Sequence, residues 1–241
     1  MEIEMYTYLI FNILIIIFPF LLSFDRRIAF WKKWPYLIFS MIVTDLIFVT
    51  WDSIVTGIGH WSFNEDHLTG IWVLGIPMEE LMFFITVPYA CLFTFEVIIS
   101  YLKDWKVPFS RVVNFSVAAV LVIGAIIFRD QGYTFIVLLY TALVVILLTL
   151  GKEPLISRRK FWIFTAGTIF LFTAFNMVLT AIPVVEYGPE FIWGGDGLFN
   201  GRFFTIPLED FFYNFSMLST YLLAYKFAKR LFRRKRKEHE E

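Results

Sequence analysis

Two pairs of adjacent carboxylic acids are the residues of this sequence best suited to acid–base chemistry. The first pair is Glu79 and Glu80, and the second is Glu209 and Asp210. Both pairs lie beside apolar, aromatic-rich segments, and two neighbouring acids in such surroundings can share a proton and titrate as a unit. One member could stay protonated near neutral pH and donate its proton to a substrate, which is general acid catalysis.

A proline precedes each pair, at Pro77 and Pro207. Proline has no backbone N–H and fits the first turn of a helix, where that donor would have no partner. We therefore expect each acid pair in the first turn of a helix. A single copy would be an ordinary helix start, in which acids interact favourably with the helix dipole. The second copy at an equivalent place favours a functional role.

We expect an aromatic shell around the acids. Aromatic faces stabilise a cation and offer no base that would quench it, so acids beside aromatic rings in an apolar pocket suit a carbocation intermediate. Polar residues that end two other apolar stretches should reach the same level as the acids. The expected substrate-binding residues are Phe83, Phe84, Phe211, Phe212, Trp51, Asp52 and Asn176.

The acid motif belongs to an internal repeat. Residues 51–56 read WDSIVT and resemble residues 175–180, which read FNMVLT. Residues 76–84 read IPMEELMFF and resemble residues 206–213, which read IPLEDFFY. The repeat predicts two structural units of one kind. In membrane proteins built from parallel repeats the functional site tends to lie between the units.

The elements that must position these residues are apolar stretches long enough to cross a membrane. The chain of 241 residues is 59% hydrophobic and 20% aromatic, against about 45–50% apolar residues in soluble domains. A membrane-spanning helix needs roughly 20 mostly apolar residues. We predict an all-α integral membrane protein of about seven transmembrane helices, near residues 6–24, 36–52, 71–101, 113–128, 133–150, 161–183 and 205–226.

Basic residues occur in alternate loops. Of the 21 Lys and Arg residues, 19 follow the first, third, fifth and seventh apolar stretches. The positive-inside rule then predicts an outside N-terminus and a cytoplasmic C-terminus for a multi-pass protein of the cell membrane. The basic tail could suggest nucleic-acid binding, but beside a membrane we favour contact with anionic lipid headgroups.

The repeat and the charges together predict the domain organisation. Residues 1–112 form a first repeat of three helices, and residues 133–226 form the second. Residues 113–132 form a connecting helix that lets both repeats cross the membrane in the same directions. Residues 227–241 form the cytoplasmic tail.

Four other polar residues have a simpler interpretation than a role in the site. Glu96 lies about 24 Å along its helix from Glu80, at ~1.5 Å per residue, and we expect it to pair with nearby lysines. Asp45 could belong to the site or bond a neighbouring helix. His60 and His67 could bind a metal beside loop acids, but solvated loop residues are favoured, and no metal site is predicted.

Missing motifs exclude several cofactors. No Gly-x-Gly-x-x-Gly follows a strand and no Walker Gly-Lys-Ser/Thr occurs, which excludes the dinucleotide and P-loop sites built on them. The single cysteine, Cys91, excludes an internal disulfide and a cysteine-based metal site within one chain. The last apolar stretch has no mid-membrane lysine for a retinal Schiff base. We therefore expect no cofactor.

The two motifs resemble those of the membrane-integral lycopene cyclases, in which two small homologous subunits form a heterodimer or are fused in one chain. The resemblance covers nearly the whole sequence and is to the fused form. It implies cyclisation of the linear ends of a carotenoid, usually lycopene to β-carotene. It also implies partners limited to the carotenoid, membrane lipids and other enzymes of the carotenoid pathway. The motif positions carried over are Pro77, Glu79, Glu80, Pro207, Glu209 and Asp210.

The resemblance leads to a hypothesis for the roles of the acids. We expect Glu79 and Glu209 to handle the proton, with Glu80 and Asp210 setting their protonation. The second copy departs from the first in having Asp210, which makes the halves chemically unequal. Two other functions stay open: a proton-coupled membrane transporter and a non-enzymatic carotenoid-binding membrane protein.

Overall fold

The computed structural model describes residues 4–151, 153–195 and 201–240, and the side chains up to residue 234. The described residues form seven α-helices, which confirms the predicted all-α class. Five of these helices, α1, α2, α3, α5 and α6, are long and apolar enough to cross a membrane. The helices are α1 (Thr7–Leu22), α2 (Trp34–Gly57), α3 (Met78–Tyr101), α4 (Arg111–Ile127), α5 (Gly132–Thr149), α6 (Arg159–Ala181) and α7 (Leu208–Glu240).

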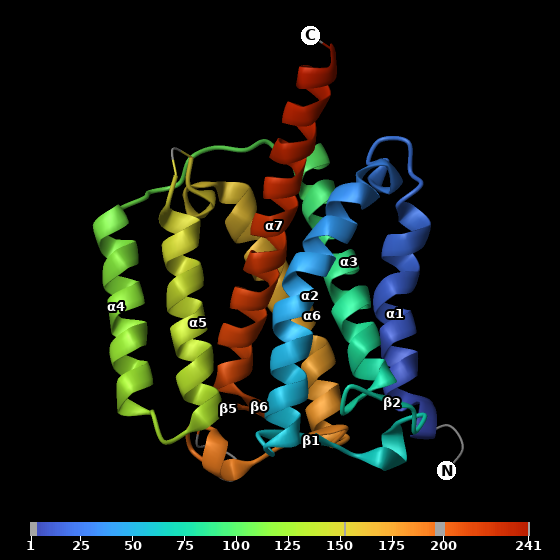
Figure 1. Cartoon of the computed structure of the whole chain (residues 1–241), viewed down its shortest axis with the longest axis vertical. Coiled ribbons are helices and arrows are strands. Elements are labelled where there is room, and N and C mark those ends of the chain that lie inside the picture. The colour runs from blue at the N-terminus through green and yellow to red at the C-terminus, as the bar shows by residue number, and fades with distance from the viewer. Residues whose placement is uncertain (1–3, 152, 196–200, 241) are drawn as a thin grey trace.

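The helices run in alternating directions, so that α1, α3, α5 and α7 point the same way (Figure 1). The first turns of α3 and α7, with the acid pairs, lie together at one end of the bundle, which we call the acid end. The other end, where α7 finishes in its basic residues, we call the basic end (Figure 1). The predicted stretch 71–101 is too long for one helix because its first residues form a hairpin before α3 begins at Met78.

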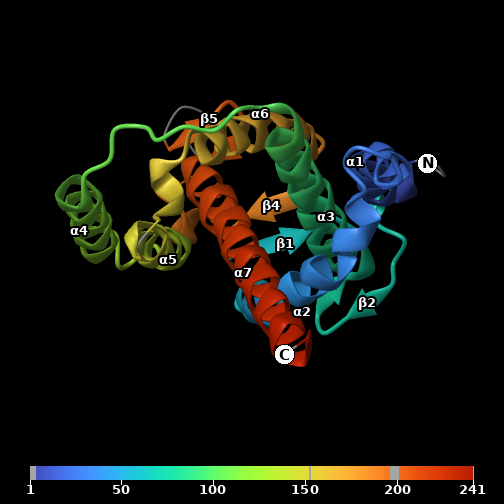
Figure 2. The ribbon, with the colours of Figure 1, turned by 90° about the horizontal axis from the view of Figure 1, so that it is seen from above.

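Helix contacts in the two halves correspond. Helix α1 packs on α3 as α5 packs on α7, and α2 packs on α7 as α6 packs on α3. Helix α4 packs on α5 at the edge of the bundle (Figure 2). A polar contact joins α1 to α3: the Asn12 amide donates to the Glu79 carbonyl oxygen (3.0 Å) and accepts from the Thr86 hydroxyl (2.6 Å). Such bonds stabilise helix pairs in lipid, where no water competes.

Short strands close the acid end. Strand β1 of the first half pairs antiparallel with β4 of the second, with Ser62 opposite Glu186. Two equivalent hairpins, β2–β3 and β5–β6, each lead directly into the helix that carries an acid pair. The hairpins share a left-handed turn residue, Leu74 (φ 56°) in one and Phe204 (φ 55°) in the other. The strands are β1 (Trp61–Phe63), β2 (Trp72–Val73), β3 (Ile76–Pro77), β4 (Val185–Tyr187), β5 (Arg202–Phe203) and β6 (Ile206–Pro207).

The described residues also form five 3₁₀ helices, one before α1 and four in connections between the other elements. One of them, η2, leads into α2 at the basic end, and η5 follows β4 at the acid end. They are η1 (Glu4–Tyr6), η2 (Phe30–Lys33), η3 (Glu65–His67), η4 (Leu155–Ser157) and η5 (Pro189–Phe191).

Candidate active site

A cavity of about 340 Å³ lies between α1, α3 and α6, and we call it the acid cavity. Ligand pockets commonly have volumes of ~300–1,000 Å³. Three carboxyl side chains line it at the acid end, those of Asp52, Glu80 and Asp210. All three are buried, and they come from α2, α3 and α7, so both halves of the chain contribute. The rest of the lining is mostly apolar and aromatic.

Glu80 accepts a hydrogen bond from a tyrosine of the first helix. The donor is the hydroxyl of Tyr8, which is itself buried in the first turn of α1. Glu80 lies in the first turn of α3. The first turns of α1 and α3 meet because the two helices pack side by side in the same direction (Figure 1).

Asp210 accepts hydrogen bonds from three side chains. The Tyr133 hydroxyl donates to one carboxyl oxygen (2.7 Å), and the Asn176 amide (2.8 Å) and Tyr187 hydroxyl (2.6 Å) donate to the other. Burial, reinforced by the charge of Asp210, raises the pKa of Tyr187 well above its ordinary value of 10.0. The Tyr187 hydroxyl therefore keeps its proton and stays a donor. With three donors the Asp210 carboxylate is held in a fixed, fully bonded position.

Asp52 is bonded on one side only. The indole N–H of Trp61 donates to its Oδ1 (2.8 Å). Its other oxygen, Oδ2, is buried and makes no hydrogen bond of good geometry within the described part of the chain, although the Thr56 hydroxyl, one helical turn further along α2, also interacts with the carboxyl group. A buried carboxyl oxygen without a partner is costly, which marks this atom as one that a proton or a ligand would satisfy.

Glu79 and Glu209 do not line the acid cavity. Each bonds instead to the loop that precedes its hairpin. Glu79 Oε1 accepts from the Thr69 backbone N–H (2.7 Å), and Glu209 Oε1 accepts from the Trp193 backbone N–H (2.7 Å) and the Thr134 hydroxyl (2.5 Å). One member of each pair thus holds a loop and the other faces the cavity.

The predicted aromatic shell is only partly at the cavity. Phe83, Asp52 and Asn176 line it, as predicted for substrate-binding residues. Phe84 does not, because it is buried in the main core beside α7. Trp51 packs instead on Trp61 and Tyr213. Phe211, which packs on Phe172, and Phe212, which is 37% exposed, do not line the cavity either.

Three tyrosines that bond the acids were missed in the sequence. Tyr8 and Tyr133 are 125 residues apart, close to the offset of 124 between Asp52 and Asn176. Extending the repeat to the start of the chain would have paired these two tyrosines. No comparable signal marks Tyr187, because its equivalent in the first half is Phe63.

The apolar part of the cavity lies beneath the surface between α1 and α6. Phe11 of α1 and Phe175 of α6 meet edge to face across it, with ring centroids 6.1 Å apart. Three further lining residues are exposed, Leu14 (52%), Phe18 (66%) and Leu171 (45%). In a membrane protein such side chains contact lipid tails, so the cavity lies next to the hydrocarbon.

The space at the acid end of the second half, equivalent to the acid cavity, is filled by side chains. Between α2, α5 and α7 the Phe48 ring packs edge to face on Tyr140 (5.3 Å) and Tyr213 (5.5 Å). At the repeat offset of 130, Tyr221 corresponds to Cys91, which lines the acid cavity. The duplicated fold therefore holds one acid cavity and one packed counterpart.

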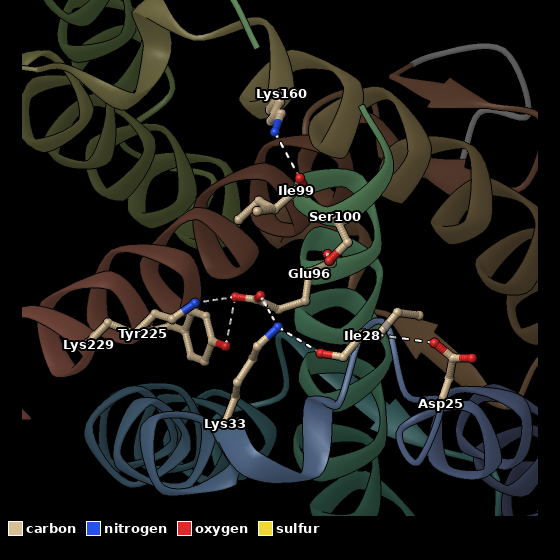
Figure 3. Close-up of polar contacts among 9 residues, drawn as sticks. All are labelled: Asp25, Ile28, Lys33, Glu96, Ile99, Ser100, Lys160, Tyr225 and Lys229. Atoms are coloured by element: carbon tan, nitrogen blue, oxygen red, sulfur yellow. Dashed lines mark hydrogen bonds and ion pairs between the residues drawn. The ribbon is translucent and has the colours of Figure 1, made fainter. Parts of the chain in front are cut away.

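The other polar residues considered from the sequence serve as structural contacts. The Tyr221 hydroxyl donates to Asp45, which decides the open alternative for Asp45 in favour of a bond to a neighbouring helix. The expected pairing of Glu96 with lysines is confirmed by Lys33 (2.6 Å) and Lys229 (2.5 Å), as Figure 3 shows. The partners come from η2 and α7, so one buried carboxylate on α3 joins three elements.

The expectation of a solvated His60 is wrong. Its side chain is 3% exposed and packs on Phe191 with ring centroids 4.3 Å apart. Burial lowers the pKa of His60 below its ordinary value of 6.5, and the carboxylate of Glu190 opposes this shift. Among the described residues there is no cluster of three or more His, Cys, Asp or Glu side chains placed to hold a metal ion.

Comparison with known proteins identifies the family. A model of the family described as Lycopene cyclase matches residues 5–98 and 130–228. Searches of curated proteins and of solved structures found no match. The matched segments make up well over half of the chain and carry both acid pairs together with Tyr8, Tyr133 and Tyr187. The chain therefore belongs to the lycopene cyclase family, the enzymes that cyclise the ends of carotenoids.

Proposed function

We propose that this enzyme closes β-rings on the linear ψ-ends of lycopene by protonation, without redox chemistry. The observation that carries the proposal is the meeting of three buried carboxyl groups, Asp52, Glu80 and Asp210, in one apolar cavity beside the lipid. A C40 hydrocarbon is insoluble in water, so its end would enter the cavity from the bilayer.

The reaction conserves protons. A carboxylic acid protonates the terminal double bond of the ψ-end and leaves a tertiary cation. The electron pair of the internal double bond attacks this cation and forms the new carbon–carbon bond of a six-membered ring. This step leaves a cation on the ring. A carboxylate then removes a proton from the neighbouring ring carbon, and the electron pair of the broken C–H bond becomes the final double bond. One proton enters and one leaves, so the chemistry requires no cofactor.

We assign the proton to the pair formed by Glu80 and Asp52. Both line the cavity, Glu80 with one side-chain donor, Tyr8, and Asp52 with a buried oxygen that has no partner. Glu79 and Glu209 also have such an oxygen within the described part of the chain, but neither lines the cavity. The two carboxyl groups interact electrostatically with each other, and neighbouring acids can hold one proton between them. After protonation of the substrate, this pair is the conjugate base that takes a proton back, which restores the enzyme.

Asp210 has a different role in this scheme. Its three donors satisfy it as a carboxylate, so it supplies a fixed negative charge near the developing cation. A charge held in place before the reaction stabilises the transition state without reorganisation. The aromatic rings of Phe83 and Tyr213, which also line the cavity, contribute through their faces.

This assignment differs from the hypothesis based on sequence. Glu79 and Glu209, expected there to handle the proton, accept hydrogen bonds from loop backbone amides and are outside the cavity lining. We propose that they hold the loops over the acid end, and that the cavity-facing members of each pair do the chemistry.

Substitution of two cavity-lining acids and of two acids outside the lining tests the proton assignment. In a lycopene-accumulating bacterium, Glu80→Gln and Asp52→Asn should each lower cyclisation by about 100-fold or more, the usual range for losing a general acid. Glu79→Gln and Glu209→Gln are the matched controls, because a glutamine oxygen still accepts the loop N–H. These controls should keep most of the activity. Chromatography of the extracted pigments measures the product.

The same experiment separates the competing interpretations. If Glu80→Gln forms β-carotene like the wild type while Glu79→Gln does not, the proton assignment is wrong. If the wild-type chain purifies with lycopene bound and forms no cyclised product from it, the carotenoid-binding alternative is favoured and the enzyme proposal fails.

A further inference from the structure

A second cavity, of about 580 Å³, lies at the basic end between α2, α5 and α7. We call it the basic-end groove. Its apolar lining includes Phe39 and Val43 of α2, Leu147 of α5, and Leu223 and Phe227 of α7. Val43 (40%) and Phe227 (58%) are exposed, so the groove faces the membrane.

Two cations, Lys226 and Arg230, also line the groove. They are four residues apart on α7 and therefore lie on one face of the helix. Within the described part of the chain neither makes a hydrogen bond or ion pair. Besides Arg230, the basic groups of Arg158 and Lys229 also act electrostatically on Lys226. The positive charge at this place is thus concentrated.

The nearby acids are already neutralised. Glu153, which lines the groove, pairs with Arg158 at 2.9 Å. The carboxylate of Glu96 binds Lys33 and Lys229 and accepts from the Tyr225 hydroxyl at 2.9 Å, and all these side chains turn toward one another in Figure 3. The exception is Asp104, which acts electrostatically on Lys226 but forms no ion pair within the described part of the chain, so the groove keeps an excess of positive charge.

Charge and apolar surface are separated along the groove. Helix α7 runs toward the basic end, so Leu223 lies deeper than Arg230 by about 10 Å at ~1.5 Å per residue. Helix α2 runs the opposite way, so Val43 lies deeper than Phe39 (Figure 1). The cations therefore lie nearer the membrane surface than Leu223 and Val43, and Phe227 lies between the two cations along α7. An amphiphile with a negative head and a hydrocarbon chain has the same arrangement.

We propose that the basic-end groove binds a phospholipid with an anionic headgroup. Its phosphate would contact Lys226 and Arg230, and an acyl chain would lie along Phe39, Val43 and Phe227. A soluble phosphate compound would use only the cations and leave the apolar surface uncovered. Basic sites between membrane helices are suited to acidic lipid headgroups.

Native mass spectrometry of the purified full chain tests this lipid site. The protein in detergent is titrated with phosphatidylglycerol, with phosphatidylcholine, and with glycerol 3-phosphate as the headgroup without chains. Phosphatidylglycerol should be retained at least about 10-fold more tightly than phosphatidylcholine, since each of two basic residues near a membrane surface contributes roughly 1 kcal/mol. Glycerol 3-phosphate should not displace it.

Variants test the charged part and the apolar part of the groove separately. The double variant K226Q/R230Q should lose the preference for phosphatidylglycerol, and Val43→Trp should weaken retention by filling the groove without a change of charge. The control R26Q/K32Q removes the same charge at the same end, away from the groove, and should bind like the wild type. Equal binding of both lipids by the wild type, or unchanged binding by K226Q/R230Q, would overturn the proposal.

Discussion

At the scale of single residues, the partners of the carboxyl groups define the chemistry more closely than the carboxyl groups themselves. Glu80 has one side-chain donor and Asp210 has three. Donors that point at a carboxylate stabilise its charged form. In the proposed mechanism the two halves therefore have different roles, the first half passing a proton and the second holding a negative charge.

The Tyr8 hydroxyl should matter through Glu80. Tyr8→Phe removes the donor and keeps the ring, so it leaves the Glu80 carboxyl group free to turn away from the substrate. A hydrogen bond to a charged group contributes about 1.5–3 kcal/mol, so we expect the rate of cyclisation to fall roughly 10- to 100-fold. Initial rates of pigment conversion by purified protein in lipid measure the effect.

Tyr6→Phe is the matched control for this prediction. Tyr6 is 44% exposed and lies two residues before Tyr8, so its variant should cyclise at the wild-type rate. An unchanged rate in Tyr8→Phe would show that the hydrogen bond to Glu80 has no part in proton transfer.

At the scale of elements, the layer over the acid end depends on contacts between loops of the two halves. Strands β1 and β4 pair across the halves, and His60, just before β1, packs on Phe191 of η5. An added Cβ at Gly132 would lie 2.7 Å from His60 Nε2, so the start of α5 also approaches this ring closely. His60 is therefore enclosed by three elements.

This enclosure predicts a pH dependence of stability. The folded protein holds the pKa of His60 below 6.5 because of burial, so below pH 6.5 the unfolded chain binds a proton that the folded chain does not. Stability should then fall as the pH drops below 6.5. Thermal unfolding in detergent at pH 7.5 and 5.5 should show that acidification lowers the midpoint of the wild type relative to that of His60→Gln, a comparison that separates His60 from the other groups that titrate in this range.

His67→Gln serves as the control because it removes a histidine of the same loop region and leaves His60 in place. Its midpoint should shift with pH as in the wild type. The explanation would be wrong if His60→Gln kept the full shift between the two pH values.

At the scale of the whole molecule, the two repeats differ at the acid end. The acid cavity is open in one repeat, and the equivalent space is filled by side chains in the other. Small side chains on α3, such as Ala90 and Cys91, leave the acid cavity open. The corresponding residues on α7 are Thr220 and Tyr221, and Tyr221 is fully buried. With one cavity the two ends of lycopene must react in turn, so a monocyclic product should appear before the bicyclic one.

Filling the acid cavity in the same way should stop the reaction. Cys91→Tyr introduces into the first half the residue that fills the second, and we expect both monocyclic and bicyclic products to disappear. The extra volume enters a cavity, which limits the destabilisation that overpacking usually causes, about 1–3 kcal/mol. Time courses of pigment composition measure the products, and thermal unfolding reports on folding.

Cys91→Ala keeps the cavity open and should convert lycopene normally. A folded Cys91→Tyr variant that still makes β-carotene would mean that the substrate binds elsewhere. If the wild type forms the monocyclic and bicyclic products together from the earliest time point, the two ends of lycopene do not react one after the other.

Several features followed from the sequence because they depend on local properties of the chain. Hydropathy over about 20 residues predicted the helices, and proline followed by two acids marked where α3 and α7 begin. The pairing of Glu96 with lysines followed from its distance along α3. The repeat was visible in aligned segments, although Tyr8 and Tyr133 were overlooked.

The packing of the helices determines which acid of each pair faces the acid cavity. Adjacent residues on a helix point about 100° apart, so Glu79 and Glu80 cannot both face one cavity, and the choice depends on where α1 and α6 pack. The same holds for Phe84 and Trp51, which pack in the core instead of lining the cavity. The choice of open half depends on side-chain volumes on helices far apart in the chain. Local patterns of residues were enough to predict the helices, the repeat and the candidate acids. Helix packing determines which of these acids line the cavity, because the side chains that surround a cavity come from residues far apart in the sequence.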